Sequence, residues 1–180
     1  MPIIDTGALV RPAFEAAEFT PTKWTTADEK AAFVKALCRF IALDYETTLF
    51  TDSLYRRLAL SFGHIAHTNK RGFIATFFED LRSKLVFIEW TLQWVPCGDP
   101  AWTYSDVERA VQARLRACDL LDAYRALHAA EMEGAERVLL KQLQAKYADG
   151  AAPTRAPVLH CSAPVRPRQA RKPEDQANLF

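Results

Sequence analysis

The sequence predicts an all-α protein, a helical bundle of about four to five helices followed by a tail outside the bundle. Apolar residues recur at spacings of three and four between residues 26 and 148, as they do on one face of a helix. The alternation of apolar and polar residues that is typical of strands is absent from the sequence. Residues 1–25, which contain three prolines, are predicted to form an irregular N-terminal arm, so the predicted helical domain covers residues 26–148.

Two helices are predicted in the first half of this domain. The first starts at Thr25 or Thr26, because Thr26 and Glu29 have the spacing of a capping box. Its apolar face consists of Phe33, Val34, Leu37, Cys38 and Ile41. A second helix is predicted from about Thr51 to Asn69, with an apolar face made of Leu54, Leu58, Phe62 and Ile65. Residues 69–72 are predicted to be the turn that follows, because Asn69 and Gly72 tolerate left-handed backbone.

The clearest pattern predicts a central helix over residues 73–94. Its apolar positions, spaced four, three, four, three and four residues apart, are Ile74, Phe78, Leu81, Leu85, Ile88 and Leu92. The prolines of residues 96–100 end this helix. Ser105 and Glu108 then form a second capping box, and no proline interrupts the sequence up to Tyr147. Residues 105–147 fit either one long C-terminal helix or two helices that break near residues 126–134.

Composition and charge narrow the class of protein. The residues before the tail hold 18 Lys and Arg against 19 Asp and Glu, a balance that argues against a nucleic-acid binder dependent on phosphate contacts. Met1–Asp5 is not a positively charged leader, and the longest fully apolar run, Leu85–Ile88, is too short to cross a bilayer. The four cysteines are scattered and form no Cys-x-x-Cys pair, as expected of reduced thiols. These features predict a cytoplasmic protein without a membrane partner.

Residues 149–175 are predicted to be a linker rich in proline and arginine. Five of the chain's ten prolines and five basic residues lie in it, and Val158-Leu159 is its only sizeable apolar group. Such a segment buries too little apolar surface to offset the entropy of ordering it. An extended linker of this length could span ~80 Å.

Residues 176–180 have the sequence Gln176-Ala177-Asn178-Leu179-Phe180. This segment resembles the Gln-x-x-Leu-Phe peptide with which bacterial DNA polymerases, repair proteins and replication regulators dock on the sliding clamp. The Gln176 amide offers donors and an acceptor, while Leu179 and Phe180 can fill an apolar pocket. The resemblance covers these five residues and implies the bacterial sliding clamp as a partner. The alternatives are an apolar chain end without a partner, or one that folds back onto the body.

His64 and His67 are candidate metal ligands. Three residues apart in a helix, they would share one face and could hold a metal together with Cys97 or Asp99. In the alternative, one histidine packs in the bundle and the other lies at the helix C-terminus, where positive charge is favourable. The second interpretation is favoured, so the sequence predicts neither a metal nor a cofactor.

Positive charge concentrates between residues 54 and 84. The basic residues of this region are Arg56, Arg57, Lys70, Arg71, Arg82 and Lys84, and its only acids are Glu79 and Asp80. One interpretation is a surface like a helix-turn-helix motif that contacts DNA phosphates. The favoured interpretation is the solvated face of a bundle, because the following helix is too apolar to be an exposed recognition helix. The region stays a candidate surface for nucleic acid or an acidic protein.

Familiar catalytic motifs are absent from the sequence. The six glycines do not cluster into a phosphate-binding loop, and neither His-Glu-x-x-His nor Gly-x-Ser-x-Gly occurs. The stretch Phe62–Phe73 resembles small helical proteins of phages and conjugative elements. With the C-terminal peptide, these features predict a non-catalytic adaptor or regulator of bacterial or mobile-element DNA metabolism. Two alternatives are a metal-dependent helical enzyme using His64 and His67, and a mobile-element inhibitor of a host defence complex acting through its helical body.

Overall fold

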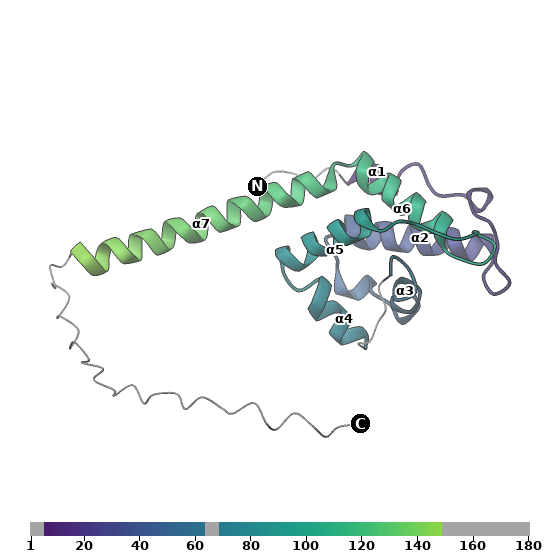
Figure 1. Cartoon of the computed structure of the whole chain (residues 1–180), viewed down its shortest axis with the longest axis horizontal. Helices are drawn as coiled ribbons and strands as arrows, with labels where there is room; N and C mark the ends of the chain where they lie inside the picture. Colours follow the sequence, from purple (N-terminus) through teal and green to yellow (C-terminus); the bar gives the residue numbers. More distant parts are fainter. Residues whose placement is uncertain (1–5, 64–68, 149–180) are drawn as a thin grey trace, which may run out of the picture. The chain divides into compact units, whose positions relative to one another are not determined.

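The computed structural model describes residues 6–63 and 69–148, and the structural statements that follow concern these residues (Figure 1). Within them the chain forms seven α-helices, two 3-10 turns and no strand, which confirms the predicted all-α bundle. The α-helices are α1 Gly7–Val10, α2 Ala27–Ala42, α3 Asp52–Leu58, α4 Lys70–Phe77, α5 Leu81–Gln93, α6 Ser105–Ala117 and α7 Leu120–Ala148. The 3-10 turns are η1 Ala16–Glu18 and η2 Thr47–Leu49. None of the described helices combines the length and hydropathy that a membrane crossing requires.

The chain divides into two compact units, Met1–Val138 and Leu139–Phe180. The first unit contains α1 to α6, the first part of α7 and the buried core of the described residues. The described part of the second unit is the remainder of α7, and its side chains from Leu139 to Tyr147 are exposed.

Helix α2 is the central element of the first unit. It begins as predicted, since the Thr26 hydroxyl accepts from the Glu29 N–H at 3.2 Å and the Glu29 carboxylate accepts from the Thr26 N–H at 2.9 Å. Its apolar face is buried, and α1, η1, α3 and α6 pack against it. Leu9 of α1 and Phe19, directly after η1, are buried as well. Short helical turns of the arm that was predicted to be irregular therefore form part of the core.

A cluster of aromatic rings joins α2 to α4 and α5. Phe40 of α2 lies 5.0 Å from Phe78, and Phe78 lies 5.0 Å from Phe87 of α5, measured between ring centroids. Tyr45 stacks on Phe78 at 4.9 Å. All four rings are at least 95% buried, and burial of such side chains stabilises a fold by roughly 1.5–3 kcal/mol each. The cluster fixes the loop after α2 against the middle of α5.

The second predicted helix is shorter than its apolar pattern indicates. Its start is confirmed, because the Thr51 hydroxyl accepts from the Leu54 N–H at 3.2 Å. However, α3 ends at Leu58, and Phe62 and Gly63 then take left-handed backbone, with φ of 55° and 64°. The Phe62 ring is buried and its N–H donates to a carboxylate of α6, so a contact distant in sequence overrides the local periodicity.

The turn predicted at residues 69–72 and the single helix predicted over 73–94 are both wrong. Asn69 is instead the N-cap of α4, and its amide oxygen accepts from the Gly72 N–H at 2.9 Å. The predicted helix breaks at residues 78–80, between α4 and α5. At the break Asp80 caps α5, accepting from the Ser83 N–H at 2.7 Å. The apolar spacing continues through the break because Phe78, at the bend, is buried in the aromatic cluster.

The capping box predicted at Ser105 and Glu108 does not form. The Ser105 hydroxyl donates to the Gly98 carbonyl at 2.9 Å, and the Glu108 side chain points into the core. Residues 105–147 form two helices, which was one of the two predicted alternatives. The break lies at Cys118 and Asp119 instead of residues 126–134, and Asp119 has left-handed backbone with φ of 46°.

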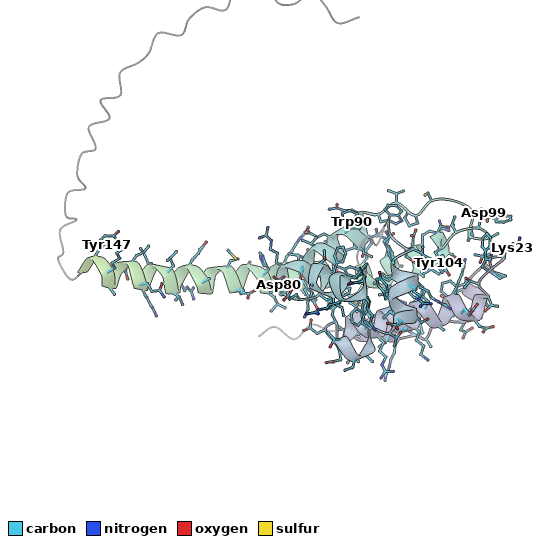
Figure 2. The ribbon with its side chains drawn as sticks, turned by 90° about the horizontal axis from the view of Figure 1, so that it is seen from below. Lys23, Asp80, Trp90, Asp99, Tyr104 and Tyr147 are labelled. Atoms are coloured by element: carbon cyan, nitrogen blue, oxygen red, sulfur yellow. The ribbon has the colours of Figure 1, made fainter. Side chains whose placement is uncertain are left out.

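The Lys30 side chain of α2 is completely buried and holds the loop between α5 and α6. Figure 2 labels Asp99 and Tyr104 of this loop. Its ammonium donates to the carbonyls of Pro100 and Thr103 at 2.9 and 3.0 Å, and to the Asp106 carboxylate at 2.9 Å. A buried charge is tolerated when it is paired and hydrogen-bonded in this way. Lys30 therefore joins α2 to the start of α6.

Candidate functional site

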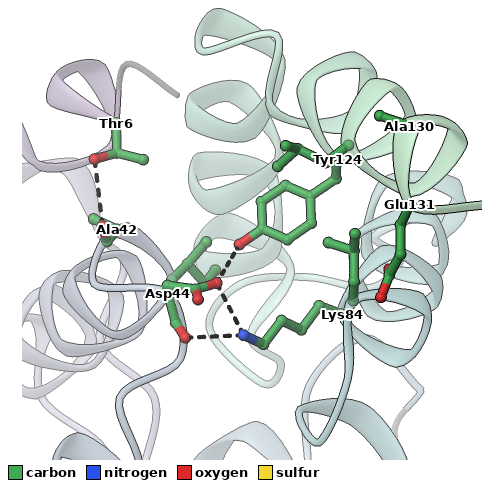
Figure 3. Close-up of a pocket in the computed structure, with 10 residues that line it drawn as sticks. Thr6, Ala42, Asp44, Lys84, Tyr124, Ala130 and Glu131 are labelled. Carbon is green, nitrogen blue, oxygen red and sulfur yellow. Dashed lines mark hydrogen bonds and ion pairs between the residues drawn. The ribbon is translucent and has the colours of Figure 1, made fainter. Parts of the chain in front are cut away.

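A groove with a cavity volume of about 870 Å³ lies where the end of α2, the start of α5 and α7 meet (Figure 3). This α2–α7 groove is lined by Thr6, Ile41, Ala42, Asp44, Leu81, Lys84, Tyr124, Leu127, Ala130 and Glu131. Its volume falls within the range of roughly 300–1,000 Å³ that is typical of ligand pockets. Five of its ten lining side chains are aliphatic, and three are charged.

Asp44 is the centre of a polar cluster on the groove wall. Its carboxylate oxygen Oδ1 accepts from the Lys84 ammonium at 3.0 Å and from the Tyr124 hydroxyl at 2.9 Å. Lys84 also donates to the Asp44 backbone carbonyl at 3.3 Å, so its ammonium bridges both parts of this residue. The side chains of Asp44, Lys84 and Tyr124 come from the loop after α2, from α5 and from α7 (Figure 3). The cluster therefore links three segments distant in the sequence.

The backbone after α2 explains how Asp44 reaches the groove. Asp44 and Tyr45 both have left-handed backbone, with φ of 52° and 61°. The Tyr45 N–H donates to the Phe40 carbonyl at 2.9 Å, and the Tyr45 ring is buried against Phe78. Left-handed backbone costs roughly 1–2 kcal/mol per residue in an L-amino acid, so burial of the Tyr45 ring offsets this cost. The turn directs Tyr45 into the core and leaves Asp44 exposed.

Burial extends towards higher pH the range over which the two tyrosines beside the groove stay neutral. It raises the pKa of Tyr124 well above the ordinary value, and the hydrogen bond to Asp44 acts in the same direction. Burial also raises the pKa of Tyr45 well above that value. Both phenols are therefore neutral at physiological pH, and Tyr124 serves as a donor to Asp44. The Tyr45 hydroxyl oxygen is buried and has no hydrogen-bond partner among the described residues.

The groove combines apolar contact area with fixed charges of both signs. Leu81 and Leu127 line it beside the Lys84 ammonium, and Glu131 adds a carboxylate from α7. The Lys84 and Asp44 side chains hold one another in place, so their charges are fixed before any ligand binds. Apolar walls with a few positioned polar groups are the chemistry of a recognition surface.

The six basic residues of the predicted surface have different surroundings. Arg57 donates to the Glu29 carbonyl at 2.6 Å, Lys70 pairs with Asp52 at 2.9 Å, and Lys84 lines the groove. The other three, which form no ion pair among the described residues, are Arg56, Arg71 and Arg82. These three arginines are exposed. A surface for nucleic acid or an acidic protein stays a prediction.

Several predicted site residues lie outside the part of the chain that the structure describes. These are His64, His67, Gln176, Leu179 and Phe180. Of the further metal ligands considered, Asp99 accepts from the Ala101 N–H at 2.9 Å and Cys97 is exposed. The described ranges contain no cluster of three or more His, Cys, Asp or Glu side chains that could hold a metal ion.

The sequence pattern missed Asp44, Tyr124 and the buried charges of the core. No feature of the sequence marked Asp44 as a site residue, because an acidic residue after a helix is ordinarily solvated. The sequence did mark Lys30, because Lys30 has the spacing of the buried face of α2, which includes Val34, Leu37 and Ile41. A lysine at such a position indicates one of two things. Either this part of the helix face is exposed to solvent, or the ammonium is buried and paired with an acceptor.

Comparisons with known proteins do not assign the chain to a family. No family model, no curated protein and no solved structure matches it. The features of the chain that bear on its function are the α2–α7 groove, the exposed length of α7 and the C-terminal sequence.

Proposed function

We propose that the protein is a non-catalytic adaptor or regulator in bacterial or mobile-element DNA metabolism, recruited to the replication sliding clamp by its C-terminal peptide. The observation that carries this proposal is the sequence Gln176-x-x-Leu179-Phe180. Leu179 and Phe180 supply the apolar contacts, and the Gln176 amide supplies directional hydrogen bonds.

The helical body contributes a second recognition surface in this proposal. The α2–α7 groove offers apolar walls and a positioned pair of charges, Lys84 and Asp44, which suit a protein or peptide ligand. The sequence between α7 and the peptide is predicted to be a linker, so the two surfaces act as tethered modules. Binding of the peptide then raises the local concentration of the body at the clamp.

The experiment is a binding assay of the full-length chain on an immobilised bacterial sliding clamp. Leu179→Ala with Phe180→Ala is expected to abolish retention, because these side chains supply most of the desolvation free energy. The matched control is Val158→Ala with Leu159→Ala, which removes the other apolar pair of the same tail. Equal retention of both variants would overturn the clamp proposal.

A further inference from the structure

The C-terminal part of helix α7 is exposed on every side. From Ala129 to Tyr147 each residue is exposed, whereas Leu120 and Tyr124 at the start of the same helix are buried. Helices shorter than about 12–15 residues are marginal alone in water, and longer ones gain most of their stability in proteins from packing of an apolar face. Because these nineteen consecutive residues are exposed, most of α7 does not pack against any other described part of the chain.

This exposed part of α7 carries an apolar stripe. At 100° per residue, Met132, Leu139 and Leu143 lie within about 40° of one another around the helix. Their exposed fractions are 49%, 54% and 42%. Leu140 and Tyr147 widen the stripe on one side. A helix that is solvated all round has no reason to align leucines on one face, so the stripe indicates a missing partner.

The charges of the same segment are separated along the helix. The acidic residues come first and are Glu131, Glu133 and Glu136. The basic residues follow and are Arg137, Lys141 and Lys146. A second α7 packed in the antiparallel direction would bring the acidic half of each helix beside the basic half of the other. A parallel helix would place like charges together, which is unfavourable.

We propose that a second copy of this chain docks on the stripe, so that two α7 helices pair in the antiparallel direction. In the register centred on Lys141, Leu139 faces Leu143 of the second copy and Glu136 faces Lys146 of the second copy. Lys141 itself projects about 180° away from the stripe by helix geometry, so the two lysines at the centre do not meet in the seam. This self-association is independent of clamp binding and is measured without the clamp.

The apolar part of the proposal is tested by sedimentation equilibrium of the full-length chain over a range of concentrations. The chain is expected to show a concentration-dependent monomer–dimer equilibrium. Leu139→Ser with Leu143→Ser should weaken it at least tenfold. The matched control is Val138→Ser, because Val138 is 55% exposed but lies about 120° away from the stripe. A chain that stays monomeric at several hundred micromolar, or equal weakening by the control, would overturn the proposal.

The direction of pairing is tested by exchanging charges. Glu136→Lys or Lys146→Glu alone should weaken the dimer about five- to tenfold at low salt, because each creates two like-charge contacts per dimer. The double variant, and an equimolar mixture of the two single variants, should both restore association. A variant that merely failed to fold would not be rescued by mixing. Single variants that associate as well as the original chain would exclude the antiparallel register.

Discussion

Lys30 and Glu108 are charged side chains inside the core, and both act as connectors between helices. The Glu108 carboxylate accepts from the Phe62 N–H at 2.7 Å and from the Trp94 indole N–H at 2.9 Å. Hydrogen bonds to charged groups stabilise a fold by roughly 1.5–3 kcal/mol each, and loss of one partner leaves the other buried and unpaired. These two residues therefore determine where the chain between α3 and α6 runs.

Lys30 and Asp106 form a buried ion pair. Replacement of one partner is expected to lower the free energy of unfolding more than replacement of the other. Asp106→Asn should lower the free energy of unfolding by about 2 kcal/mol, because it leaves the buried ammonium without its counter-charge. Lys30→Met should cost less, since it removes the charge that needs a partner and keeps an apolar stem of similar length. Urea denaturation of both variants measures the difference. A larger loss for Lys30→Met would contradict this description of the pair.

Cys38 provides a test of burial that depends on pH. Burial in α2 raises the pKa of its thiol from 9.0 to about 12, so the folded state retains the proton where the unfolded chain releases it. The free energy of unfolding should therefore fall as pH rises from about 9 towards 12, and Tyr45 and Tyr124 act in the same direction.

The same burial makes Cys38 unreactive at pH 8. Iodoacetamide labelling followed by peptide mass spectrometry should modify the exposed Cys97 faster by on the order of a hundredfold or more. In denaturant the two rates should become similar, which serves as the control. Rapid labelling of Cys38 in the folded chain would show that α2 is not packed as described.

At the scale of helices and turns, the sequence predicted helical structure well and helix ends poorly. The starts at Thr26 and Thr51 were predictable because their caps are local. The breaks at residues 78–80 and at Asp119 were not, since apolar spacing continues through both. What ends these helices is a contact with a distant residue or a left-handed backbone position, and neither leaves a periodic signal. The groove escaped prediction for the same reason, because its Asp44, Lys84 and Tyr124 come from three separate segments.

Substitution of glycine by alanine should have opposite effects on stability at Gly63 and at Gly134. Gly63 has φ of 64°, and an added Cβ would lie 2.4 Å from the Trp94 ring, so Gly63→Ala should destabilise the fold by about 2 kcal/mol or more. Gly134 lies inside α7 with nothing within 4 Å of an added Cβ, so Gly134→Ala should increase helix content and stabilise α7 by about 0.5–1 kcal/mol. Thermal unfolding followed by circular dichroism compares the two variants. Stabilisation by Gly63→Ala would contradict the close approach of Trp94.

At the scale of the whole molecule, the protein would combine a helical body with a short docking peptide. In this proposal the α2–α7 groove and the α7 stripe would provide surfaces for protein partners, and Gln176, Leu179 and Phe180 would connect the chain to the clamp. A body that pairs through α7 would present two such peptides, and two tethered peptides bind a multivalent target more tightly than one.

The most direct test of the central claim is calorimetry with a peptide of residues 171–180 and a purified bacterial sliding clamp. A peptide this short buries little area and loses freedom on binding, so a Kd on the order of 1 μM or weaker is predicted. The peptide with Leu179→Ala and Phe180→Ala should not bind. Absence of binding at hundreds of micromolar, where even weak docking is measurable, or equal binding of the double-alanine peptide, would contradict the proposal.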